Sequence, residues 1–210
     1  MNPIASLAHF FQAGGVFMFP ILAVAVVGLA ITIERVLYIR RAGAENRKLW
    51  TEIMPLVNRG DLAGAESTAS SSESPVGRIF SNGIARSRST SNRQDVEMAM
   101  DESLMEVSPL LEKRTHYLAT FANVATLLGL LGTIVGLIDG FSAIAHVNPA
   151  EKADALSASV SEAMNCTAFG LIVAVPLLII HAWLSSQTNE LIDSLEMASV
   201  KFLNALGLKN

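Results

Sequence analysis

The stretch 126–143, T-L-L-G-L-L-G-T-I-V-G-L-I-D-G-F-S-A, is too apolar for the surface of a soluble protein. It also holds more glycine than an ordinary core helix, since each glycine costs a helix roughly 1 kcal/mol relative to alanine. On a helix, small or weakly polar residues recur every three or four positions along one face, namely Ala119, Ala122, Thr126, Gly129, Thr133, Gly136, Gly140 and Ala143. Such spacing lets membrane helices approach closely, as do the two overlapping G-x-x-x-G pairs of Gly132, Gly136 and Gly140. We interpret the stretch as a tightly packed membrane helix or as a helix that lines a narrow passage.

The composition of the whole chain is that of a membrane protein. Of 210 residues, 51% are hydrophobic and 16% are charged. Three stretches contain no Asp, Glu, Lys or Arg, namely Gly15–Ile33, Thr115–Ile138 and Ala163–Asn189. Each is close to or above the roughly 20 residues that a spanning helix needs. The sequence therefore predicts an all-α integral membrane protein with three transmembrane helices.

The distribution of charge predicts the topology. Of the 15 Lys and Arg residues, 12 lie between Arg35 and Arg114, and Lys152 alone lies between the second and third spans. By the positive-inside rule the N-terminus is outside and the C-terminus inside. No Lys or Arg precedes Arg35, so we read the first span as a retained anchor. The expected order is an outer amphipathic segment (1–14), a first span (15–39), a cytoplasmic helical region (40–114), a second span (115–145), an outer loop (146–156), a third span (157–186) and a cytoplasmic helix (187–210).

Local signals divide the cytoplasmic region into helices. The first is expected to end at Asn58-Arg59-Gly60, and Asp61 to cap a short helix that runs to about Ala69. The next is expected over 76–88, before a break at 87–92, with Ile79, Phe80, Ile84 and Ala85 on one face. From Arg93 we expect a continuous helix to Ala145 in which Pro109 is the only breaker, so that long helices extend into the cytoplasm. The tail places Leu191, Leu195, Ala198, Phe202 and Ala205 on one face, which predicts packing on other helices.

The second and third spans can be paired by depth. The outer loop centres near Ala150, and Thr133 and Thr167 each lie 17 residues from that centre, so they should share one level. Asp139 and Glu162 pair in the same way, nearer the outer face. The third span has a small face of its own, made of Ala163, Thr167, Gly170 and Ala174. Pro176 is expected to kink this span or to loosen one of its turns.

The ionisable residues of the spans are the candidate functional groups. Glu162 lies about 140° around the helix from Thr167, so it should face a neighbouring helix or subunit. The alternative for Asp139 and Glu162 is a solvated place at the headgroup level. The alternative for the threonines is a hydroxyl bonded to its own helix. His116 and His181 are expected to pack at the interface.

Several classes of function lack their motifs. The chain has no G-x-x-x-x-G-K-[ST], no G-x-S-x-G and no His, Cys and carboxylate residues at metal-ligand spacing. Its single cysteine, Cys166, excludes an intramolecular disulfide. The net charge of -4 gives no case for nucleic acid binding. We therefore expect no enzyme activity, no metal and no cofactor.

Two segments resemble the MotA/TolQ/ExbB proton-channel family. They are G-L-L-G-T-I-V-G-L-I-D-G-F at 129–141 and S-E-A-M-N-C-T-A-F-G-L-I-V-A-V-P at 161–176. The residues that match its pattern are Gly129, Gly132, Thr133, Gly136, Glu162, Thr167, Gly170, Ala174 and Pro176. Three spans with the N-terminus outside resemble the ExbB/TolQ branch, since the MotA branch usually has four. The chain departs from the family at Asp139, where ExbB often has Asn, and at Cys166.

The resemblance implies a homopentameric ring in the bacterial inner membrane, with a central pore lined by the second and third spans. A dimer of single-span partners of the ExbD/TolR type would thread the pore and carry the titrating Asp. Thr133 and Thr167 would face that Asp, with Glu162 in the outer part of the pore. Ion flow would turn the ring, and force would reach a periplasmic target through a protein such as TonB or TolA.

Three alternatives stay open beside a proton-driven stator. A sodium-driven stator fits the hydroxyl groups as well. A non-conducting scaffold of helices would use the glycine faces for packing alone. A secondary transporter is disfavoured, because three spans without an inverted repeat do not match that architecture.

Overall fold

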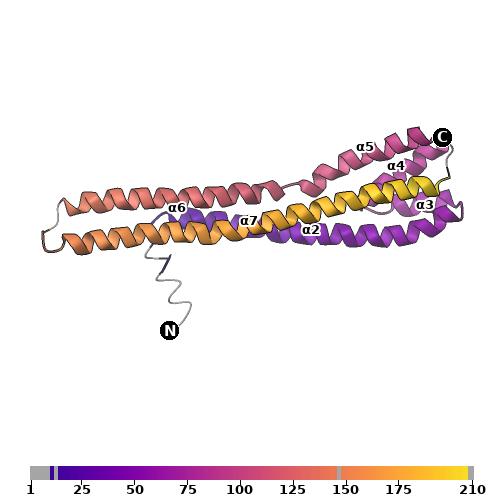
Figure 1. Cartoon of the computed structure of the whole chain (residues 1–210). Coiled ribbons are helices and arrows are strands. Elements are labelled where there is room, and N and C mark those ends of the chain that lie inside the picture. Colours follow the sequence, from indigo (N-terminus) through magenta and orange to yellow (C-terminus); the bar gives the residue numbers. More distant parts are fainter. Residues whose placement is uncertain (1–9, 12–13, 146–147, 208–210) are drawn as a thin grey trace. The chain divides into compact units, whose positions relative to one another are not determined.

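The computed structural model describes residues 10–11, 14–145 and 148–207, which form helices joined by short connections, with no strand among them (Figure 1). The helices are α2 (Met18–Asn58), α3 (Leu62–Ser70), α4 (Pro75–Ser89), α5 (Arg93–Glu112), α6 (Thr115–Ile144) and α7 (Lys152–Ala205). The predicted all-α fold is confirmed. Most of the predicted outer segment 1–14 lies outside the described residues, as do parts of the loop 146–156 and of the tail.

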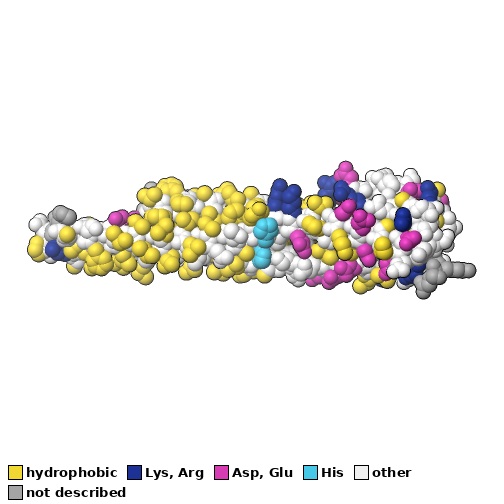
Figure 2. All heavy atoms as spheres, turned by 90° about the horizontal axis from the view of Figure 1, so that it is seen from above, with side chains coloured by type: hydrophobic (Ala, Val, Ile, Leu, Met, Phe, Trp, Pro, Cys, Tyr) yellow, Lys and Arg dark blue, Asp and Glu magenta, His cyan; other side chains and the backbone are white. Residues whose placement is uncertain are grey.

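Three helical stretches are long and apolar enough to cross a membrane, namely Met18–Asn58, Arg93–Ile144 and Lys152–Ala205. This confirms a multi-pass membrane protein with three candidate spans. The chain divides into two compact units, each described below by itself. Unit 1 comprises the chain up to Ile33 together with Arg114–Ala182, and unit 2 comprises Glu34–Lys113 together with the chain from Trp183 onward. Hydrophobic side chains dominate the visible face of unit 1, whereas charged side chains gather on that of unit 2 (Figure 2).

Unit 2 is a helical bundle around one apolar core. The Phe80 ring of α4 stacks on Phe202 of α7, with ring centroids 4.1 Å apart and planes at 10°. Trp50 of α2 lies against the same Phe80, at 5.8 Å. Phe202 and Leu195 are buried in this core. The prediction that the C-terminal helix packs on other helices is therefore confirmed, because its apolar stripe supplies part of the core.

The ends of the short helices follow the sequence signals. Helix α2 ends at Asn58, and Gly60 takes a positive φ of 75°, which a glycine adopts without steric cost. Asp61 then caps α3, since its Oδ1 accepts a hydrogen bond from the Gly64 backbone N–H at 2.9 Å. Ser74 caps α4 in the same way through Gly77. The predicted stop and the predicted cap are both confirmed.

The prediction of a helical run from Arg93 to Ala145 with Pro109 as its only breaker is wrong. Helix α5 ends at Glu112, and α6 begins at Thr115 after Arg114, which has a φ of 67°. A left-handed residue is usually glycine or asparagine, so an arginine there gives no signal in the sequence. Pro109, the expected breaker, is accommodated inside α5.

Two smaller expectations also change. Helix α4 continues to Ser89, so the break occupies 90–92 rather than 87–92. Its buried face contains Ile79, Phe80 and Ile84 as predicted, but Ala85 is exposed. The reason is geometric, since the buried arc also includes Gly83 and Ala85 lies opposite it. The third span and the C-terminal helix form one helix, α7, which continues through Pro176.

Candidate functional site

The candidate site lies in unit 1, where α6 and α7 pack antiparallel through glycine. A methyl group on Gly170 would come within 2.7 Å of the Ala125 carbonyl oxygen and 3.1 Å of Gly129 Cα. A methyl on Gly129 would in turn lie 3.2 Å from Thr167 Cα. The two backbones are therefore in direct contact here, which only glycine allows.

The other small residues of α6 pack against α7 in the same antiparallel register. Gly132 lies against Cys166 of α7 and also against Phe17, which precedes α2, while Gly136 lies against Ala163. Gly140, nearer the end of α6, lies against Ser159. Ala174 is buried as well, at 2% exposure. The glycine-rich stretch therefore packs the hairpin and contacts the start of the first span.

The packing face differs in part from the small stripe drawn from the sequence. The buried residues of α6 include Ala122, Ala125, Gly129, Gly132 and Gly140. Thr126 and Ala143, both members of the stripe, are exposed. Periodicity identified the correct side of the helix but placed its centre too far round, because size alone does not say where the partner helix sits.

The structure brings Thr133 and Thr167 together, at the shared level that their spacing predicts. Their hydroxyl oxygens are in hydrogen-bond contact. The Thr167 hydroxyl donates across the hairpin to the Gly129 carbonyl oxygen at 2.9 Å. The Thr133 hydroxyl is 3.1 Å from the same carbonyl oxygen and 3.4 Å from that of Ala163. Four oxygen atoms from two helices thus converge, and we call this group the threonine cluster.

The threonine cluster lies at one edge of the hairpin contact rather than at its centre. Thr133 is about 40° around α6 from Gly129, given 100° per residue. Both threonines are partly buried, whereas Gly129 and Gly170 are fully covered. A hydroxyl oxygen has one proton to donate and two lone pairs, so it retains acceptor capacity toward a group at this edge.

Neither carboxylate joins the threonine cluster. Glu162 is exposed, and its carboxylate lies against Gly15, which has a φ of 74° just before α2. Gly15 is not itself helical, so the expectation that Glu162 faces a neighbouring helix or subunit stays a prediction. Asp139 is exposed as well.

Some groups at the site could not be found by reading motifs. The carbonyl oxygens of Gly129 and Ala163 carry no residue-type signal. Phe169 packs edge-on against Phe10 and Phe11, with centroids 6.3 and 5.9 Å away, and nothing in the sequence pairs these positions. No group of three His, Cys, Asp or Glu side chains that could hold a metal occurs in the part of the chain that the structure describes.

Comparison with known proteins places this hairpin in a family. The sequence model of the MotA/TolQ/ExbB proton channel family matches residues 71–197. The chain is 27% identical over 169 residues to the biopolymer transport protein ExbB-like 3 of Synechocystis sp., covering 80% of each chain. It is 26% identical to an ExbB homolog of Methanothermobacter thermautotrophicus, covering 94% of this chain and 69% of that one. It is also 32% identical over 91 residues to TolQ of the Tol-Pal system of Haemophilus influenzae, covering 43% and 40%. The family match spans more than half of the sequence and includes the threonine cluster, and the chain therefore belongs to the MotA/TolQ/ExbB proton channel family, in its ExbB/TolQ branch.

Proposed function

We propose that this protein is the stator subunit of an inner-membrane motor driven by the proton-motive force. Five copies form a ring whose central pore is lined by α6 and by the unit 1 part of α7. Unit 2 lies in the cytoplasm, and a dimer of single-span partners of the ExbD/TolR type threads the pore. The motor transmits force to a periplasmic or outer-membrane process, through a protein of the TonB or TolA kind.

The observation that carries this proposal is the threonine cluster. Two hydroxyls and two carbonyl oxygens converge at one depth, at the edge of a helix contact. A carboxylic acid on a threaded partner can pass its proton to a threonine oxygen while that hydroxyl passes its own proton to the next acceptor, because a hydroxyl both donates and accepts. The cluster therefore supplies the polar step that a proton needs in the middle of an apolar passage.

A sodium-driven stator is the second candidate, and the same four oxygens favour it. Hydroxyl and carbonyl oxygens are the hard ligands that alkali and alkaline-earth cations prefer. The two ions are distinguished with the reconstituted complex, since removal of sodium stops a sodium motor and leaves a proton motor running.

The subunit count tests the ring directly. Native mass spectrometry of the purified protein should show a species of about 112 kDa, five times the 22.4 kDa of one chain. Such a pentamer has room for a central pore. A monomer or dimer that persists in several mild detergents leaves no pore, and the protein would then be a scaffold.

Glu162→Gln is expected to lower ion flux about tenfold without changing the subunit count. The exposed carboxylate lies five residues on the outer side of Thr167, where it attracts cations entering the pore. Flux into vesicles that contain the subunit and its partner is the measurement. Asp139→Asn is the matched control and should change flux less than twofold. Equal losses in the two variants would mean that only the net charge of the outer face matters.

A further inference from the structure

Unit 2 carries an open groove of about 1100 Å³ between α2 and α7. Its apolar lining includes Trp50 and Leu191, which are partly buried against the core of the unit. Its charged lining residues are Arg40, Arg47, Lys48, Lys201, Glu190 and Asp193. Four cations face two carboxylates, so the groove has a net positive charge. We call it the basic groove.

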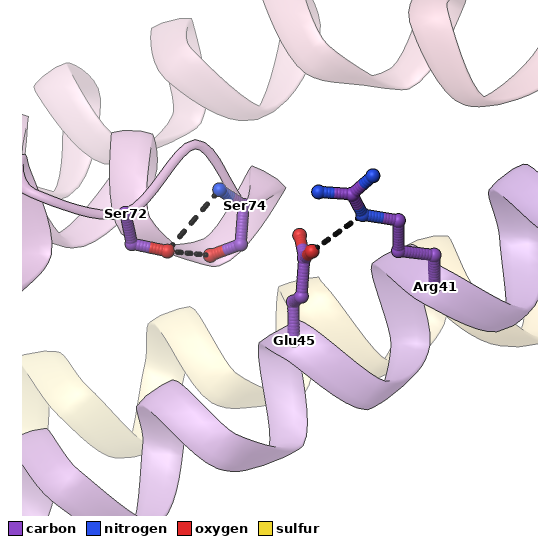
Figure 3. Close-up of polar contacts among 4 residues, drawn as sticks. All are labelled: Arg41, Glu45, Ser72 and Ser74. Carbon is purple, nitrogen blue, oxygen red and sulfur yellow. Dashed lines mark hydrogen bonds and ion pairs between the residues drawn. The ribbon is translucent and has the colours of Figure 1, made fainter.

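Three of these four cations form no ion pair with another described residue. Arg41, which does not line the basic groove, forms an ion pair with Glu45 one turn along α2 at 2.7 Å (Figure 3). That hydrogen bond and the charge of Glu45 raise the pKa of Arg41. In contrast, the side chains of Arg40, Arg47 and Lys201 are exposed and make no ion pair among the described residues. They are available to an acidic partner.

The dimensions of the groove argue against a lipid headgroup as its occupant. Arg40 lies next to the predicted inner end of the first span at residue 39, but Lys48 lies nine residues beyond that end, or about 14 Å along the helix. One headgroup at the membrane surface cannot reach both. The carboxylates of Glu190 and Asp193 would repel a compact polyanion bound in the groove. A helix with apolar side chains flanked by carboxylates matches the lining better.

Helix α5 of the same chain presents such a surface. One side of α5 is buried in unit 2 through Val96, Met100 and Val107. On the opposite side Met98 and Met105 are 62% and 74% exposed. Asp101 and Glu102 lie between these methionines and are also exposed. We call Met98, Asp101, Glu102 and Met105 the acidic ridge, and none of the four lines the basic groove.

We propose that the acidic ridge of one copy docks into the basic groove of the next copy around the ring. Methionine side chains adapt to an irregular apolar floor, while the carboxylates meet Arg47 and Lys201. Because ridge and groove are different patches, the contact is head-to-tail, and repetition of such a contact forms a ring when the rotation between neighbouring copies closes. This inference rests on the proposed ring and adds the surfaces that join its subunits.

Cross-linking tests the contact in the full-length protein. The variant Met105→Cys/Met197→Cys, in which Met197 lines the basic groove, is made with Cys166→Ala and treated in membranes with a short bis-maleimide. We expect a ladder of covalent oligomers that ends at the subunit number found by native mass spectrometry. Met105→Cys/Ser89→Cys is the matched control, because Ser89 is exposed but lies outside both surfaces. It should give no ladder.

Reversing the charges of the acidic ridge or of the basic groove is a second test of the contact. Asp101→Arg/Glu102→Arg and Arg47→Glu/Lys201→Glu should each reduce the cross-linked ladder at least fivefold, and the two pairs combined should restore it. A ring without a ladder overturns the docking contact and leaves the stator proposal standing, whereas a monomeric wild type overturns both. Cross-links with Met105→Cys alone also overturn it, since they require two ridges face to face. Phospholipid that co-purifies with the wild type and is lost in Arg47→Glu/Lys201→Glu assigns the groove to lipid instead.

Discussion

The double variant Thr133→Val/Thr167→Val is expected to form the same ring as the wild type but to conduct about 30- to 150-fold fewer ions. Each hydroxyl contributes a hydrogen bond worth about 1 to 1.5 kcal/mol to an ion or proton at the threonine cluster, and 1.36 kcal/mol corresponds to a tenfold change in rate. Valine keeps the shape of threonine, so the helices still pack. Hydrogen bonds between membrane helices contribute only about 0.6 kcal/mol each to stability, which assembly can lose.

The measurement is ion flux into vesicles that contain the subunit and its partner, alongside native mass spectrometry of the same preparation. Thr32→Val is the matched control, since the Thr32 hydroxyl donates to the Gly28 carbonyl oxygen of its own helix at 2.9 Å and lies outside the cluster. Normal flux in the double variant would reduce the cluster to a packing contact and favour the scaffold. If the double variant lost both the ring and the ion flux, the threonine cluster would have a structural role instead.

Gly170→Ala is expected to destabilise the α6–α7 hairpin by about 1 to 3 kcal/mol, the usual cost of overpacking. The added methyl meets the Ala125 carbonyl oxygen at 2.7 Å and Gly129 Cα at 3.1 Å, and both are backbone atoms of the facing helix. Neither can rotate away, so the two helices must separate. The threonine cluster depends on this approach, because Thr167 reaches the Gly129 carbonyl oxygen across the hairpin. Unfolding in detergent with increasing sodium dodecyl sulfate measures the loss.

Gly43→Ala is the control for this substitution. Gly43 is a helical glycine of α2 in unit 2, and a methyl there would meet its nearest neighbour, Leu191, at 3.9 Å. That is ordinary contact, so the gain in helix propensity, about 1 kcal/mol, should appear as a slight stabilisation. If Gly170→Ala were equally stabilising, the close backbone approach at the hairpin would be wrong.

The level shared by the two threonines could be predicted because an antiparallel hairpin has one register. Residues equidistant from the turn must lie at the same depth, and the hydrogen bonds of the threonine cluster agree with that count. The same arithmetic places Asp139 level with Glu162, and the contacts of Gly136 with Ala163 and of Gly140 with Ser159 keep that register. Depth follows from counting residues, whereas direction around the helix depends on which neighbours are present.

Features that depend on chain segments far apart in sequence could not be predicted. The turn at Arg114 uses a residue type that rarely adopts a positive φ. The carboxylate of Glu162 rests against Gly15, nearly 150 residues earlier in the chain, where no local pattern suggests a partner. The basic groove joins residues of α2 to residues near the end of α7, and it exists only because those helices lie side by side within unit 2.

The sequence by itself determined the three apolar spans, the Asp61 helix cap, the glycine-rich side of α6 and the depth of the threonines, because these features depend on residue type and on the fixed rise of a helix. The tertiary structure decided which residues of α6 lie at the centre of its contact with α7, where the long helix breaks and which oxygen atoms surround the threonines. Those outcomes depend on how side chains and backbones of distant segments fit against each other. Close packing, unlike periodicity, is a property of the assembled helices and not of any one stretch.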